Sequence, residues 1–163
     1  MRKWIRTKLT TCTKHIIFIF VRKVNKKNHM KDYNTPFIIE FPKIGKSDLG
    51  FISIAEKENL PFVPKRIYWT YYTPEDVERG GHSHFDLQQI LVAVAGKIEI
   101  TTELLNGEKK SFILERPNVG LFIPKMCWRT MKYTHNAVQM CIASNEYDEK
   151  DYIRDYNVFL ETK

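Results

Sequence analysis

The chain has 163 residues, of which 43% are hydrophobic and 13% aromatic; this is long and apolar enough for one folded domain and excludes a disordered chain. Residues 1–31 hold ten of the 26 Lys and Arg and none of the 19 Asp and Glu, so the rest of the chain has a net charge of −3 and offers no basic groove for nucleic acid. The three cysteines, Cys12, Cys127 and Cys141, form no paired motif, which is typical of a protein of the reducing cytoplasm.

The basic N-terminal tail, residues 1–31, contains one apolar block at residues 16–21. Six residues are too few to cross a bilayer, and a secretory signal needs a longer apolar region and a cleavage site, so we expect no integral membrane segment. The tail is either a weak surface anchor or a stretch that precedes the true start, for which Met30 is the candidate. We therefore expect the functional domain at residues 32–163.

From Pro36 onward the sequence is a series of short strands separated by turns, rich in β-branched and aromatic residues. We expect strands at residues 37–41, 50–56, 65–73, 87–95, 97–102, 110–114, 119–123, 128–132 and 137–143. The run at 87–95 is almost entirely apolar, which indicates burial on both faces. The pair Asn106-Gly107 is typical of a tight hairpin turn.

A helix is expected at residues 148–160, where Tyr152, Ile153, Tyr156 and Phe159 recur at three- and four-residue steps and Asp148 can cap the start. Nine short strands and one terminal helix, with no glycine-rich nucleotide loop and no repeating strand-helix unit, predict an all-β fold. The architecture expected is a barrel or jelly roll of short antiparallel strands with a C-terminal helix.

Residues 79–84 read Arg-Gly-Gly-His-Ser-His and precede the most apolar strand. In an extended strand, residues two apart point to the same face, so His82 and His84 would lie side by side. The two glycines allow a tight turn or the close approach of a ligand, and Arg79 supplies a permanent cation suited to phosphate. This stretch is the candidate active site.

A small barrel with two histidines in this arrangement has the outline of a cupin. Metal-binding cupins add a glutamate after the second histidine and a further histidine on a later strand. Here Gln89 stands at the glutamate position, and residues 125–129 contain no histidine, so the sequence predicts no bound metal. Two neighbouring imidazoles then form a proton-transfer pair; the alternative is that both are structural.

Other candidate binding residues lie on two predicted strands. Arg66 and Tyr68 can line the barrel mouth, although alternation sends Tyr68 and Trp69 to opposite faces. Trp128 and Arg129 follow Pro124 on a later strand. An aromatic ring and a guanidinium suit a nucleotide base and a pyrophosphate, respectively.

The order of these motifs resembles the sugar-nucleotide 3,4-ketoisomerases of the WxcM-like group, over residues 36–160. The matching positions are Gly50, Ile54 and Glu56, residues 61–62, 65–68, 79–84 and 120–124, Trp128, and residues 143–144, 147–148 and 151–156. The basic tail has no counterpart in the family pattern.

The resemblance implies a cytoplasmic cupin homodimer, commonly with exchanged N-terminal strands. It implies conversion of dTDP-4-keto-6-deoxyglucose to a dTDP-3-keto-6-deoxyhexose without a cofactor, for deoxyamino sugars of surface polysaccharide or S-layer glycan. His82 and His84 become the acid/base pair, and Arg79, Tyr68 and Gln89 surround the sugar and phosphates. Either imidazole can serve as the base that removes the C3 proton.

Three competing functions share this outline: a sugar-nucleotide 3,5-epimerase, a non-catalytic sugar-binding cupin and a metal-dependent cupin oxygenase. An epimerase would use a lone histidine with an aspartate partner and a tyrosine acid, so the tandem histidines favour the isomerase. A sugar sensor would carry a DNA-reading helical domain, for which the sequence gives no sign.

Overall fold

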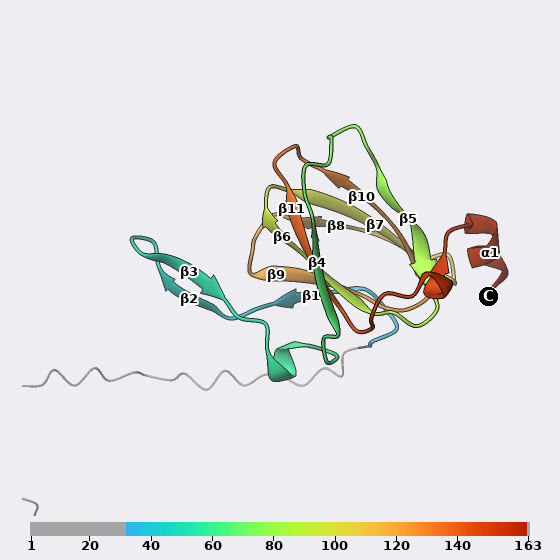
Figure 1. The fold of residues 1–163 in the computed structure, drawn as a ribbon, viewed down its shortest axis with the longest axis horizontal. Helices are drawn as coiled ribbons and strands as arrows, with labels where there is room; N and C mark the ends of the chain where they lie inside the picture. The colour runs from blue at the N-terminus through green and yellow to red at the C-terminus, as the bar shows by residue number, and fades with distance from the viewer. Residues whose placement is uncertain (1–31, 163) are drawn as a thin grey trace, which may run out of the picture. The chain divides into compact units, whose positions relative to one another are not determined.

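The structure is a computed structural model that describes residues 32–162. Within these residues the chain forms two five-stranded antiparallel sheets and one separate hairpin (Figure 1). The first sheet has the order β1-β9-β6-β11-β4, with bounds Phe37–Glu40, Val119–Ile123, Gln89–Ala95, Val138–Ala143 and Arg66–Thr70. The second has the order β12-β5-β10-β7-β8, with bounds Tyr152–Ile153, Arg79–His84, Cys127–Tyr133, Ile98–Leu104 and Lys109–Leu114.

The two sheets pack face to face, because their apolar side chains form one buried cluster between them. Leu91, Leu121 and Cys141 come from the first sheet, and Ile98 and Ile100 from the second. Burial of this apolar surface is the main force that holds the sheets together. The all-β jelly-roll fold predicted from the sequence is confirmed.

Strand β6 is buried on both faces over residues 89–93, as its apolar run predicted, whereas Val94 and Ala95 at its end are exposed. Leu91 points into the cluster between the sheets, whereas Ile90 and Val92 join a second cluster on the outer face. Phe41 and Phe122 belong to that second cluster, which covers the outside of the first sheet.

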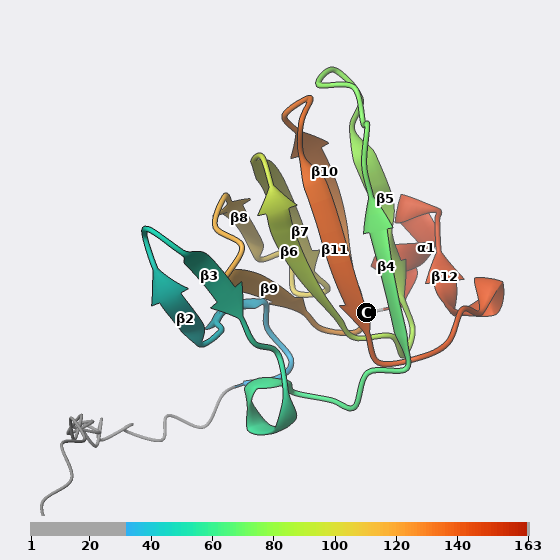
Figure 2. The same ribbon diagram turned by 60° about the vertical axis from the view of Figure 1, so that its left-hand side comes forward.

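Strands β2 (Lys43–Lys46) and β3 (Gly50–Ser53) form the separate hairpin, and the 3-10 turn η1 (Lys57–Asn59) follows it. The hairpin projects away from the two sheets (Figure 2). All eight of its strand residues are exposed, including Ile44, Phe51 and Ile52. Strand β2 had not been predicted, since Gly45 and two lysines weaken its pattern.

The prediction of one helix over residues 148–160 is wrong in its extent. The segment contains the 3-10 turn η2 (Glu149–Asp151), the short strand β12 and the helix α1 (Tyr156–Glu161). Asp148 caps η2, whereas Asp155 caps α1 by accepting hydrogen bonds from the N–H groups of Asn157 and Val158. Tyr152 and Ile153 are strand residues because they pair with β5.

The Asn106-Gly107 hairpin joins β7 to β8, and the N–H of Glu108 donates to the Asn106 side chain. No helix in the part of the chain that the structure describes is long and apolar enough to span a membrane. The predicted basic tail, residues 1–31, lies outside the described residues.

Candidate active site

A cavity of about 470 Å³ lies between the two sheets and is lined by side chains of β4, β5, β6, β10, β11 and the C-terminal segment. Its volume is in the range of small-molecule binding pockets. Six of the residues predicted from the sequence line it: Arg66, Tyr68, Arg79, His82, Gln89 and Arg129. The fold thus gathers, from four strands, side chains that are up to 63 positions apart in the sequence.

Two glycines shape the strand that carries the histidines. Gly80 and Gly81 have φ values of +90° and +62°, a region that favours glycine. A Cβ at Gly80 would lie 2.5 Å from the carbonyl oxygen of Arg129, where β5 meets an irregularity of β10. Gly80 therefore permits the close approach of two backbones rather than that of a ligand.

His82 borders the cavity with one ring nitrogen already engaged. Its Nδ1 lies 2.9 Å from the carbonyl oxygen of Gly80. Because a carbonyl can only accept, Nδ1 carries the proton, and Nε2 of the neutral ring keeps its lone pair. His82 is thus held in the tautomer that a general base requires.

His84 lies on the same side of β5, as the strand periodicity predicted, but behind His82. The two ring centroids are 5.2 Å apart and the rings are perpendicular, at 88°. Only 2% of His84 is exposed, and it is not among the residues that line the cavity. The ring of Tyr152 packs against both imidazoles, with centroids 5.1 Å from His82 and 4.2 Å from His84.

Both imidazoles are held neutral. Burial, followed by the cationic Arg129, lowers the pKa of His82 to about 4, although the Gly80 carbonyl opposes this shift. The same two causes lower the pKa of His84 far below its usual range. At neutral pH both rings are therefore uncharged, and His82 can accept a proton.

Arg129 is a buried cation at the floor of the cavity. Its guanidinium donates to the backbone carbonyl of His82 at 3.0 Å and to Oε1 of Gln89 at 2.7 Å. Among the described residues it has no carboxylate partner, and its Nε is buried without a hydrogen bond. A buried guanidinium without a counter-charge favours an anionic ligand or a developing negative charge.

Gln89 connects Arg129 to Tyr68. Its amide nitrogen donates to the hydroxyl oxygen of Tyr68 at 2.8 Å and to Sγ of Cys141 at 3.4 Å. Both ends of the Gln89 amide are hydrogen-bonded to protein groups, so Gln89 bridges Arg129 and Tyr68. In metal-binding cupins the glutamate at this position would instead coordinate the metal. Among residues 32–162, no three His, Cys, Asp or Glu side chains gather in a way that could hold a metal ion.

Further arginines surround the cavity. Arg66 lies over the rings of Tyr68 and Tyr147, at 5.2 and 5.5 Å from their centroids, and its Nε is buried without a hydrogen-bond partner among the described residues. Arg79 is exposed at the cavity wall. Arg154 donates to both carboxylate oxygens of Glu149, at 2.8 and 3.0 Å. Together with Arg129 these cations suit the two phosphates of a nucleotide sugar.

Trp128 does not line this cavity, whereas its neighbour Arg129 does. Successive residues of β10 point to opposite faces, and Arg129 takes the inner one. The indole instead packs against Tyr156 and Phe159, with centroids 5.1 and 5.6 Å away. It supports helix α1 on the outer face of the second sheet.

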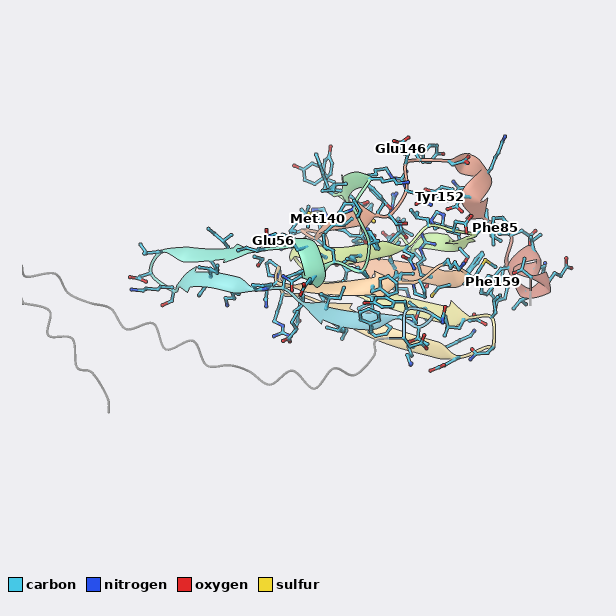
Figure 3. The ribbon with its side chains drawn as sticks, turned by 90° about the horizontal axis from the view of Figure 1, so that it is seen from below. Glu56, Phe85, Met140, Glu146, Tyr152 and Phe159 are labelled. Atoms are coloured by element: carbon cyan, nitrogen blue, oxygen red, sulfur yellow. The ribbon has the colours of Figure 1, made fainter. Side chains whose placement is uncertain are left out.

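Residues of the C-terminal segment were missed by the sequence analysis. Tyr147, Tyr152 and Arg154 line the cavity, as do Tyr133 and Gln139. Figure 3 shows Tyr152 on the side of Phe85, away from Glu56. The sequence analysis placed these residues in a helix that begins at Asp148, so they were not considered for the site. Asp155, three positions after Tyr152, is a second possible N-cap residue and would have indicated a later helix start.

Comparison with known proteins agrees with this geometry. The family described as "FdtA: WxcM-like, C-terminal" matches residues 33–163. The TDP-4-oxo-6-deoxy-alpha-D-glucose-3,4-oxoisomerase of Aneurinibacillus thermoaerophilus is 36% identical over 123 residues, which cover 75% of this chain and 88% of that protein.

Solved structures of similar proteins include two ketoisomerases. A 3,4-ketoisomerase from Helicobacter canadensis is 39% identical, with a TM-score of 0.74, over 78% of this chain and 96% of that one. The sugar 3,4-ketoisomerase QdtA from Thermoanaerobacterium thermosaccharolyticum, solved in complex with TDP, is 36% identical, with a TM-score of 0.75, over 80% and 94%.

A dTDP-4-dehydrorhamnose 3,5-epimerase from Bacillus anthracis has the same fold, with a TM-score of 0.65 over 75% of this chain and 79% of that one. At 13% identity it supports the fold alone, and so the epimerase alternative has less support than the isomerase. The family match over most of the chain and the relatives above 30% identity show that this chain belongs to the FdtA, WxcM-like family, which confirms the resemblance to sugar-nucleotide 3,4-ketoisomerases.

Proposed function

We propose that this isomerase moves the keto group of a TDP-linked 6-deoxyhexose from C4 to C3, with dTDP-4-keto-6-deoxyglucose as its substrate. The observation that carries the proposal is the neutral His82, whose free Nε2 borders a cavity lined by four arginines. The named activity of the 36% identical oxoisomerase supports the same substrate. A related ketoisomerase variant has been solved with TDP-4-keto-6-deoxyglucose bound.

His82 acts as the base in this proposal. The C4 ketone acidifies the proton on C3, and Nε2 of His82 removes that proton to give an enediolate across C3 and C4. A proton then passes from the C3 oxygen to the C4 oxygen, and the imidazolium of His82 delivers its proton to C4, which leaves the ketone at C3. The negative phosphates of the substrate raise the pKa of His82 from its low value in the free protein, which strengthens the base when substrate is bound.

Tyr68 and Arg129 steady the oxygens of the enediolate. Gln89 donates to the hydroxyl oxygen of Tyr68, so that hydroxyl keeps its own proton; Sγ of Cys141 accepts this proton in the free protein, and a ligand oxygen can take the place of the sulfur. Burial, above all, raises the pKa of Tyr68 far above its usual range, so this proton stays in place until a stronger base forms beside it. Arg129 supplies the positive charge near the developing oxyanion.

His84 has a supporting role in this mechanism. The sequence led us to expect that one of the two imidazoles would deliver a proton to C4, but His84 is buried behind His82 and does not line the cavity. It packs against His82 and Tyr152 and fixes their positions. Arg66, Arg79 and Arg154 are left to bind the diphosphate.

The test is incubation of the purified protein with dTDP-4-keto-6-deoxyglucose, followed by NMR of the product. The expected product is a dTDP-3-keto-6-deoxyhexose with the keto carbon at C3. A product epimerised at C3 and C5, with the ketone still at C4, would overturn the isomerase in favour of the epimerase. Recovery of unchanged substrate would point to a non-catalytic binding protein.

We also propose that the chain acts as a homodimer in the cytoplasm. The hairpin β2–β3 exposes Ile44, Phe51 and Ile52 away from the sheets, and the outer face of β4 exposes Ile67 and Trp69. Large apolar side chains exposed on an edge hairpin and on a sheet face favour burial in a subunit interface. Light scattering after size exclusion should give twice the chain mass, and Phe51→Glu should shift the protein towards the monomer.

A further inference from the structure

The carboxylate of Asp151 ties the C-terminal segment to the end of β5. One oxygen accepts the N–H of Asp86 at 2.7 Å, and the other accepts the N–H of Leu87 at 3.2 Å. The backbone carbonyl of Asp151 accepts the N–H of Phe85 at 3.0 Å. Asp151 therefore holds the turn between β5 and β6 and places the next residue, Tyr152, opposite His84.

The same carboxylate reaches the inner histidine. Oδ2 of Asp151 lies 3.1 Å from Nδ1 of His84, whose side chain is 2% exposed. Among the described residues neither ring nitrogen of His84 makes a hydrogen bond of good geometry, and the backbone of Asp151 also acts on this ring by raising its pKa. A carboxylate at this distance favours the tautomer with the proton on Nδ1.

The two imidazoles are surrounded mainly by cations, so a nearby carboxylate would favour their protonated form. Arg129 and Arg66 face His84, and Arg129 and Arg154 face His82; all of them oppose a positive charge on the imidazoles. Glu149 acts in the other direction on His82 from the cavity rim. Asp151 is the carboxylate that lies behind the pair, on the buried side where charges are poorly screened.

We propose that Asp151 is a positioning residue for the isomerase reaction, acting through His84. It orients His84 against His82 and Tyr152, and its negative charge stabilises the imidazolium that forms when His82 takes the C3 proton. The inference rests on the role proposed above for His82. It explains why a carboxylate that already secures a turn also contacts the buried ring.

The first experiment compares Asp151→Asn with Asp148→Asn in steady-state kinetics. Asp148 caps η2, the 3-10 turn that contains Asp151, by accepting the N–H of Lys150 and does not touch either histidine, so it controls for damage to the segment. We expect Asp151→Asn to lower kcat by about tenfold or more with KM nearly unchanged, a loss typical of residues that orient a reacting side chain. Equal kcat values for the two variants would overturn the inference.

The pH profile separates charge from structure. Loss of the Asp151 charge should lower the pKa of His82 in the free enzyme, so the acid limb of kcat/KM should move to lower pH in Asp151→Asn. Asp151→Glu keeps the charge and should keep the acid limb near its wild-type position, whatever its effect on thermal stability. A shift of the acid limb in Asp151→Glu by as much as in Asp151→Asn would contradict the proposal.

A double-mutant cycle tests the route through His84. If Asp151 acts through that ring, Asp151→Asn should have little further effect on kcat in a His84→Asn background. An undiminished effect would mean that Asp151 serves the fold alone. If His82→Asn keeps wild-type turnover, the proposed role of His82 fails, and the inference about Asp151 fails with it. If His82→Asn is inactive and Asp151→Asn behaves like Asp148→Asn, only the inference about Asp151 fails.

Discussion

Gln89 donates its amide hydrogen to the hydroxyl oxygen of Tyr68 at 2.8 Å, and this one direction decides what Tyr68 can do. A hydroxyl whose oxygen accepts from the protein keeps its own proton for another acceptor. Tyr68 lines the cavity that His82 also lines, so a sugar oxygen bound there can accept this proton in place of Sγ of Cys141. His82, the proposed base, and Tyr68, the proposed acid, thus border one cavity from two different sheets.

Replacement of Tyr68 by Phe should lower kcat by about 100-fold, near the lower end of the range for general acid/base groups. The ring and its packing remain, so the affinity for TDP should change little. Isothermal titration with TDP and product formation measured by NMR give the two quantities. Tyr71→Phe, which alters an exposed ring, should match the wild type; a Tyr68→Phe enzyme as fast as that control would remove Tyr68 from the mechanism.

The positive charge of Arg129 helps to lower the pKa of His82. Its removal in Arg129→Met should raise the pKa of His82 from about 4 towards the usual value of 6.5, although burial still holds it below that value. The imidazole signals of His82, followed by NMR as a function of pH, report this change. A His82 pKa that stays the same or falls in Arg129→Met would show that the guanidinium does not act on this ring.

The stability of the protein should depend on pH through the same ring. Because the folded-state pKa of His82 is depressed, the unfolded chain binds the proton between pH 4 and 6.5 and the folded chain does not. Stability should therefore fall as the pH drops through this window, by about 1.4 kcal/mol per pH unit for each such histidine. Urea unfolding at several pH values should show a smaller slope for His82→Asn than for the exposed control His135→Asn; equal slopes would contradict the assignment.

Gly80 and Gly81 offer a matched pair for backbone strain. Both have positive φ, but a Cβ at Gly80 would collide with the carbonyl of Arg129, whereas a Cβ at Gly81 has nothing within 4 Å. Gly81→Ala should lose about 1 kcal/mol of unfolding free energy from its φ alone, and Gly80→Ala should lose several times as much because β5 must also move away from β10. If both variants lose a similar unfolding free energy in urea, β10 can move away from a Cβ at Gly80 at little energetic cost.

The sequence predicted the face of β5 that carries the histidines, because a period of two needs only that the strand be extended. It also predicted Arg66, Tyr68 and Gln89 on the cavity, since strand alternation and motif order constrain them. The sequence could not predict how deeply each histidine is buried relative to the cavity. Whether His84 borders the cavity or lies behind His82 depends on the packing of Tyr152, which comes from a segment 68 positions later.

Two expectations from the sequence differ from the structure. Trp128 and Arg129 were assigned together because both follow Pro124, but a strand sends neighbours to opposite faces and the sequence does not mark which face is inner. Residues 148–160 have helical spacing along their whole length, yet pairing with β5 keeps Tyr152 and Ile153 extended. At Tyr152 and Ile153 a tertiary contact overrides the local pattern.

In the proposed mechanism Nε2 of His82 takes the proton from C3. The direct measurement is exchange of the C3 hydrogen of dTDP-4-keto-6-deoxyglucose in D₂O, followed by NMR, for the wild type, His82→Asn and His135→Asn. We expect exchange with the wild type and with His135→Asn, and exchange at least about 100-fold slower with His82→Asn, which still binds TDP. Exchange by His82→Asn at the wild-type rate would contradict the account.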